Sequence, residues 1–86
     1  MGLAEDRAML QGGAEKLQEA LGKLQGVIQD VEDATGMVAA TVQGYDAQDL
    51  IEALGMIGMA SERCTEAGQA IAGATSNLEG YIGRMS

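Results

Sequence analysis

The sequence lacks several residue types on which most enzymes and most β-proteins depend. Its 86 residues include no histidine, proline, phenylalanine or tryptophan, and only two tyrosines and one cysteine. Without histidine, the usual general base at neutral pH and the commonest metal ligand are both missing. With so few aromatic residues, a sheet core of the usual kind is not expected. The composition therefore favours an all-α protein that has no enzymatic activity, no cofactor and no metal.

Basic residues and long apolar runs are also scarce. Thirteen acids face five bases, which gives a net charge of −8. Such a charge repels nucleic-acid phosphates and anionic lipid headgroups alike. The longest apolar run, Ala53–Ala60, is far shorter than the roughly 18 residues that a membrane helix needs. We therefore expect no nucleic-acid partner and no membrane association. Because the first residues lack the pattern of a signal peptide, we expect a cytoplasmic location, or export without a cleaved signal.

Apolar residues recur instead in two long heptad patterns. The first begins at Leu3 and the second at Ala47, and each continues in steps of three and four residues for about eleven positions. Alternation by two, which a strand would require, is nowhere sustained. Patterns of this length predict two helices that pack along their whole length through heptad positions a and d, here called the seam.

A short connection separates the two patterns. Gly44 tolerates a positive φ at the end of a helix, and Asp46 can cap the start of the next one. We expect helices at about 4–43 and 47–85 with a turn at 44–46. Because a turn this short forces neighbouring helices to be antiparallel, residues 1–86 are predicted to form a single helical hairpin.

Folding the hairpin at that turn places large seam residues opposite small ones. Leu21 is expected to face Gly68, and Ala14 to face Thr75, which would let the helices approach closely. Cys64 belongs to the same seam. We interpret Cys64 as a core residue rather than a nucleophile, because burial among apolar side chains makes a thiol inert.

A third column of small residues precedes each a position, at heptad position g. A two-helix seam needs only positions a and d, whereas a three-column apolar face is typical of four-helix bundles. We therefore predict that two hairpins dock face to face. The alternative is that alanine, a good helix former, occupies a solvated surface. The two columns, here called the Ala columns, are Gly13, Ala20, Val27, Ala34 and Thr41, and Ala53, Ala60, Ala67, Ala74 and Tyr81. The predicted dimer interface comprises Ala20, Val27, Ala34, Ala53, Ala60, Ala67 and Ala74.

The charges divide the hairpin into two halves. From Leu24 through Glu62, here called the turn half, there is no lysine or arginine, whereas the remaining residues, the open half, hold every base. An acidic turn half could attract a basic partner, and methionines outside the seam often mark protein contacts. The alternatives are solubilising charges and half-buried flanks of a bundle. The partner-binding candidates are Met37, Met56, Met59, Ile51, Asp30, Glu32 and Asp33.

Three features occur together in this chain: a Val42-Gln43-Gly44 bend, heptads of Leu and Ala, and Tyr81 in the C-terminal part of the second predicted helix. In this layout the chain resembles the WxG-motif helical-hairpin proteins of type VII (ESX) secretion systems. At the bend this chain keeps the glycine and has Val42 in place of tryptophan, and Met85 occupies the acidic position of the export motif. The resemblance implies a homodimeric or heterodimeric four-helix bundle that acts as a small secreted factor or as the partner of a larger effector protein.

Three functions remain open at this point. The first is a WxG-like interaction module of a type VII-like secretion system, and the second is a freestanding coiled-coil adaptor or assembly subunit without a secretion role. The third, a membrane-active peptide, is disfavoured by the acidic charge. In the first two cases the expected partner is a second copy of the chain or a related helical hairpin.

Overall fold

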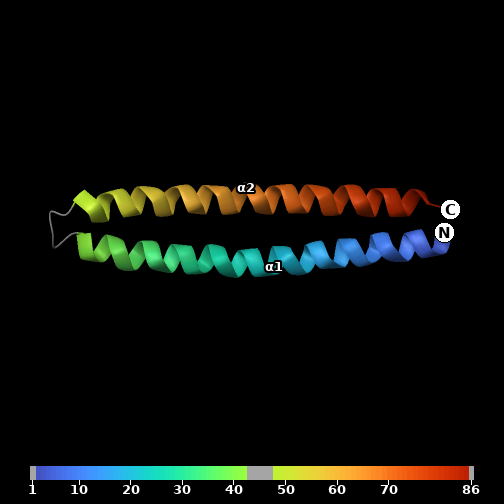
Figure 1. Ribbon diagram of the computed structural model, residues 1–86, viewed down its shortest axis with the longest axis horizontal. Helices are drawn as coiled ribbons and strands as arrows, with labels where there is room; N and C mark the ends of the chain where they lie inside the picture. The colour runs from blue at the N-terminus through green and yellow to red at the C-terminus, as the bar shows by residue number, and fades with distance from the viewer. Residues whose placement is uncertain (1, 43–47, 86) are drawn as a thin grey trace.

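The structure is an antiparallel pair of long helices. The computed structural model describes residues 2–42 and 48–85. Helix α1 spans Leu3–Val42 and helix α2 spans Gln48–Arg84. The start of α1 lies beside the end of α2 (Figure 1). The all-α hairpin predicted from the heptads is therefore confirmed.

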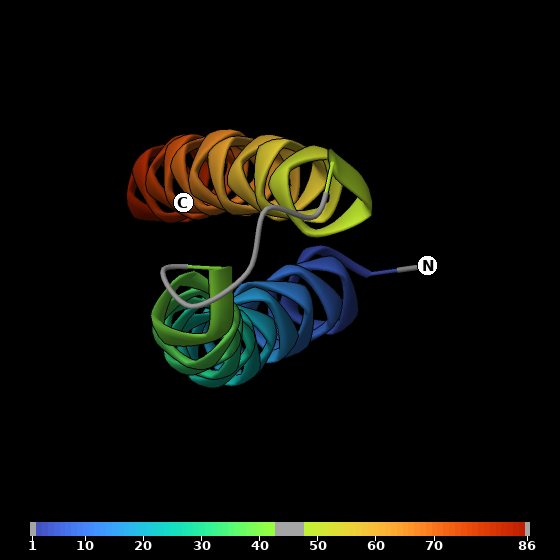
Figure 2. The ribbon, with the colours of Figure 1, turned by 90° about the vertical axis from the view of Figure 1, so that its left-hand side faces the viewer.

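The helix bounds agree with the sequence-based expectation to within a residue at the two outer ends. Helix α1 begins one residue earlier than expected and α2 ends one residue earlier. The predicted turn residues Gly44 and Asp46 lie outside the described residues. The molecule measures 64 × 17 × 14 Å, a length close to the roughly 60 Å that 40 residues occupy at 1.5 Å per residue. The end-on view shows the two helix axes inclined to one another (Figure 2), as in coiled-coil pairs.

Charged side chains match the polarity of the helix ends. Glu5 and Asp6 occupy the first turn of α1, and Arg84 occupies the last turn of α2, where each charge opposes the local helix dipole. Arg7, which interrupts the apolar stripe, donates a hydrogen bond of 2.9 Å from Nη2 to the carbonyl oxygen of Met85. It therefore satisfies a carbonyl at the C-terminal end of α2 that has no partner within the helix.

The seam is where the two helices bury their side chains. Every described a and d residue from Arg7 to Val42 and from Leu50 to Met85 is buried or half-buried. Ala14 and Thr75 are the most enclosed, at 6% and 8% exposed. The Thr75 hydroxyl donates to a carbonyl one turn earlier in its own helix, so the seam encloses no unpaired hydroxyl there.

The predicted pairing of large with small residues is observed at Gly68. A methyl group added at Gly68 would lie 3.7 Å from Leu21 Cδ1 and 3.6 Å from Leu24 Cδ2. These are ordinary van der Waals separations, so glycine at this position allows the leucines of α1 to lie against the α2 backbone. Leu3 departs from the expectation: it is 49% exposed because the seam opens at the end of the hairpin.

Candidate docking surface

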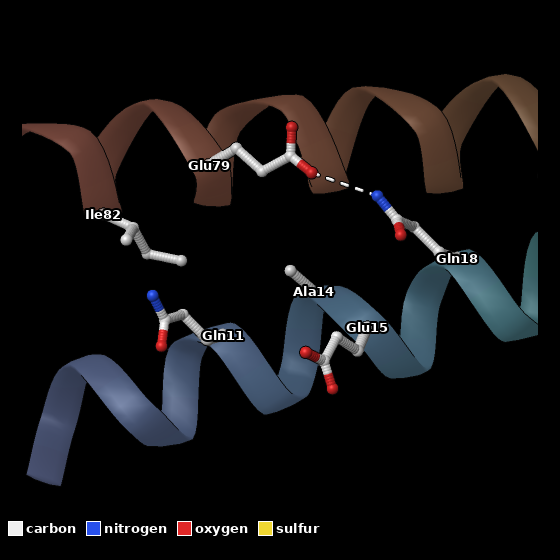
Figure 3. Close-up of a pocket in the computed structure, with 6 residues that line it drawn as sticks. All are labelled: Gln11, Ala14, Glu15, Gln18, Glu79 and Ile82. Carbon is white, nitrogen blue, oxygen red and sulfur yellow. Dashed lines mark hydrogen bonds between the residues drawn. The ribbon is translucent and has the colours of Figure 1, made fainter.

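The two Ala columns lie on the same side of the hairpin. In an antiparallel helix pair, position g of one helix flanks position g of the other, and position e flanks position e. Asp6, one heptad before Gly13, lines a notch together with Tyr81 of the other column. On the opposite side, the e-position residues Gln18 and Glu79 are joined by a hydrogen bond (Figure 3). The small residues of both helices thus form one continuous strip.

The single hairpin leaves much of this strip open. Among the predicted interface residues, Ala20, Ala34 and Ala53 are half-buried beside the seam. Val27 is 47% exposed. The other three, Ala60, Ala67 and Ala74, are exposed. Each predicted interface residue is therefore at least partly exposed in the single hairpin.

Basic residues flank the strip. Side chains three residues apart on a helix are neighbours, and the c position lies three residues beyond each member of an Ala column. Four of the five bases occupy c positions, whereas Arg7 lies in the seam. One contact shows this adjacency directly, since Arg84 Cζ lies 5.9 Å from the centre of the Tyr81 ring. The four flanking bases are Lys16, Lys23, Arg63 and Arg84. We call the Ala columns together with these flanking positions the docking face.

Three exposed methionines also occupy flanking positions of the docking face. Met37 and Met56 are 73% and 70% exposed, and Met9 is 67% exposed. Sequence reasoning missed Met9 because it considered only the turn half. The predicted apolar candidates do not share one surface, because Met59 lies on the back of α2, opposite the seam, and Ile51 lies on the side of Gln18 and Glu79.

The predicted acidic candidates are also divided between faces. Asp30 occupies a flanking position of the docking face, whereas Glu32 and Asp33 lie on other sides of α1. Asp49, which was not among the candidates, also occupies a flanking position. Among the described residues, the side away from the docking face holds nine acids and no base; we call it the acidic side. These acids are Glu5, Glu15, Glu19, Glu32, Asp33, Glu52, Glu62, Glu66 and Glu79. The exposed Lys16–Glu19 ion pair, at 3.4 Å, links the two surfaces and contributes little to stability.

The open end of the hairpin carries a hollow on each side. The apolar notch on the docking face has a volume of about 520 Å³ and is lined by Leu3, Asp6, Met9, Leu10, Tyr81 and Met85. The hollow on the acidic side measures about 400 Å³ and is lined by polar groups around Ala14 (Figure 3). There Gln18 Nε2 donates to Glu79 Oε1 at 3.1 Å. The short side chain of Ala14 leaves this second hollow between the helices.

The hairpin buries less surface than a compact monomer of its size. Its accessible surface is 6136 Å², whereas the scaling for monomeric proteins gives about 4,800 Å² at this mass. No large side chain among the described residues is fully buried. The excess of roughly 1,300 Å² exceeds the roughly 800 Å² per partner that a standard protein interface buries.

Other kinds of site find no support in the described residues. No group of three or more histidine, cysteine, aspartate or glutamate side chains there is placed to hold a metal ion. Cys64 is half-buried in the seam. Neither α1 nor α2 contains a segment long and apolar enough to cross a membrane. Comparison with protein-family models, curated proteins and solved structures finds no match for this chain.

Proposed function

We propose that this chain is a non-enzymatic interaction module that acts by docking its Ala columns onto a second helical hairpin to form a four-helix bundle. The observation that carries the proposal is the accessible surface of 6136 Å², together with the finding that no large side chain in residues 2–42 and 48–85 is fully buried. A second hairpin on the docking face would cover the Ala columns, Val27 and the flanking methionines, and would supply the buried apolar area that this chain lacks.

The proposed partner is a second copy of the chain or a related hairpin. Alanine-lined helix faces allow helices to approach closely, and the four flanking bases surround this strip with charge that can orient a partner. The acidic side, in contrast, carries nine like charges among its described residues. Such a surface repels its own copy and keeps the assembled bundle soluble.

The experiment compares two double variants of equal composition and charge. Ala60→Glu with Ala67→Glu places two carboxylates within the docking face, whereas Ala40→Glu with Ala72→Glu places them at exposed alanines elsewhere. We expect light scattering to give a dimer mass at micromolar concentration for the parent chain and the control. The docking-face variant should give a monomer mass, because burying an unpaired charge is costly. A monomeric parent chain would contradict self-association, and a dimeric docking-face variant would place the interface elsewhere.

We further propose a biological role for this interaction module. The resemblance to WxG-motif hairpins supports a role as a small secreted factor, or as the partner of a larger effector, in a type VII-like secretion system. Tyr81, which carries part of that resemblance, lies near the end of α2. Its side chain is 53% exposed and is therefore accessible for recognition by another protein. The alternative is a freestanding adaptor or assembly subunit. Detection of the tagged chain in culture medium, with and without the secretion ATPase of its host, distinguishes the two.

A further inference from the structure

Two copies of the docking face can be stacked by a two-fold axis in two ways. An axis across the hairpin gives a head-to-tail pair, in which each helix runs antiparallel to its own copy. An axis along the hairpin gives a head-to-head pair, in which α1 lies beside α2 of the second copy. The two arrangements bring different side chains together. The positions of charged and large side chains on the docking face therefore determine which of the two orientations is favoured.

We propose that a second copy of this chain docks head-to-tail, so that Met37 of the second copy enters the notch at the open end. This inference rests on the proposed self-association and adds its orientation, its register and the occupant of the notch. It is carried by three observations: the charges of the two halves, the residues that would meet along the docking face, and the position of the notch.

The two halves of the hairpin differ strongly in charge. The turn half, residues 24–62, holds seven acids and no base, for a net charge of −7, whereas the remaining residues hold six acids and five bases, for a net charge of −1. A head-to-head pair would stack the two strongly acidic halves on each other. A head-to-tail pair places each acidic half against the half that contains all the bases. Like-charge repulsion therefore favours the head-to-tail orientation.

The flanking positions of α1 are complementary in the head-to-tail arrangement. Antiparallel self-pairing about Lys23 brings Lys16 beside Asp30 of the second copy, and Met9 beside Met37 of the second copy. The first pair joins opposite charges, and the second joins two of the most exposed apolar side chains, at 67% and 73%. Lys23 meets its own copy at the axis. The long lysine side chains can diverge into solvent there.

Helix α2 shows the same complementarity. Self-pairing about Ala67 brings Arg84 beside Asp49 of the second copy, and the bulky Tyr81 beside Ala53 of the second copy. The two acids at flanking positions of the docking face, Asp30 and Asp49, thus each gain a base. In the head-to-head arrangement only Asp30 gains one, from Arg63 of the second copy.

One two-fold axis can relate both the α1 pairs and the α2 pairs. The pairings place the axis near residue 23 of α1 and residue 67 of α2. The structure brings these levels together, because Gly68 lies against Leu21 and Leu24. The contacts of Gly68 with Leu21 and Leu24 involve none of the residues paired on the docking face. The agreement between these contacts and the pairs therefore supports the head-to-tail register independently.

The notch at the open end fits this arrangement. Its volume is about 520 Å³, and its apolar residues include Leu3 and Met9, which are 49% and 67% exposed in the single hairpin. Head-to-tail docking places the turn half of the second copy over the notch, with Met37 at the level of Met9. An unbranched, flexible methionine side chain suits an irregular apolar hollow.

Disulfide trapping tests the orientation. In a Cys64→Ser background, Met9→Cys with Met37→Cys should give a covalent dimer under mild oxidation, because the two positions meet between copies. Within one chain they lie 28 residues apart on one helix, about 42 Å, which no disulfide can span. The matched control, Met37→Cys with Met56→Cys, should give a covalent dimer only from a head-to-head pair. Each single-cysteine variant should remain uncrosslinked.

The outcomes separate this inference from the proposed function. Light scattering on the reduced variants first establishes whether a dimer is present. A monomer would contradict self-association itself. A dimer that crosslinks through Met37→Cys and Met56→Cys, and not through Met9→Cys and Met37→Cys, would overturn the head-to-tail orientation while leaving self-association in place.

A charge exchange provides a second test that does not depend on oxidation. Asp30→Lys should weaken the dimer roughly tenfold at low salt, because two symmetry-related attractive contacts become repulsive. Adding Lys16→Asp to the same chain should restore the dissociation constant to within about threefold. In a head-to-head pair Lys16 faces no acid, so the second substitution would restore nothing. Both effects should fade as salt is raised.

Discussion

The seam and the docking face both contain small residues, but these are buried to different extents. In the seam, Ala14 and Thr75 are 6% and 8% exposed, because the opposite helix covers them. On the docking face, Ala60 and Ala67 lie one position before a seam residue, at heptad position g, and remain exposed. The comparison separates two surfaces: the seam holds the two helices together, whereas the docking face stays largely uncovered in the single hairpin. Substitutions can therefore be made in the seam without changing docking-face residues, and on the docking face without changing seam residues.

The largest expected effect comes from the seam. Leu24→Ala removes a side chain that lies against Gly68, and we expect it to lower the free energy of unfolding by about 2–3 kcal/mol. Its control is Met59→Ala, at a site 57% exposed on the back of α2, where the loss should stay within about 0.5 kcal/mol. Urea unfolding followed by circular dichroism measures both. Equal losses in the two variants would mean that the seam does not hold the hairpin.

Sequence periodicity was sufficient to predict the seam. A heptad pattern is a property of the helix itself, and each seam side chain needs only the opposite helix to be buried, so the placement of Leu21 against Gly68 followed from the position of the turn. Leu3 was misplaced because a terminal seam residue lacks a neighbour beyond it. The notch at the open end was missed for the same reason, since it exists only where the helices end.

The grouping of charges on the docking face was not predicted, although the sequence contains the signal. Reading the bases along the chain assigns them to the open half, whereas reading them by heptad position shows that Lys16, Lys23, Arg63 and Arg84 share position c. The same reading would have included Met9 among the candidates. The two Ala columns lie on the same side only if the helices are antiparallel. The structure was therefore needed to establish that the four bases flank one common surface.

A smaller effect of opposite sign should sharpen the contrast within the seam. Gly68→Ala adds a methyl group at ordinary contact distances from Leu21 and Leu24 and removes the entropic cost of glycine inside a helix. We expect it to stabilise the hairpin by about 0.5–1 kcal/mol, and Gly68→Leu to destabilise it by about 1–3 kcal/mol through overpacking. Thermal unfolding of the two variants at equal concentration measures the difference. If both changes stabilised the protein, the helices would not be in close contact there.

The smallest expected effect tests whether the acidic side is excluded from docking. Glu79→Ala removes the acceptor of an exposed hydrogen bond from Gln18, and we expect a loss of at most about 0.5 kcal/mol in unfolding free energy. Gln18→Ala and the double variant complete a thermodynamic cycle that isolates the pair. The dimer mass should be unchanged in all three, because these side chains lie away from the Ala columns. A monomeric Glu79→Ala variant would show instead that the acidic side takes part in association. The proposal that association involves only the docking face would then be wrong, even if every predicted seam contact between α1 and α2 were confirmed.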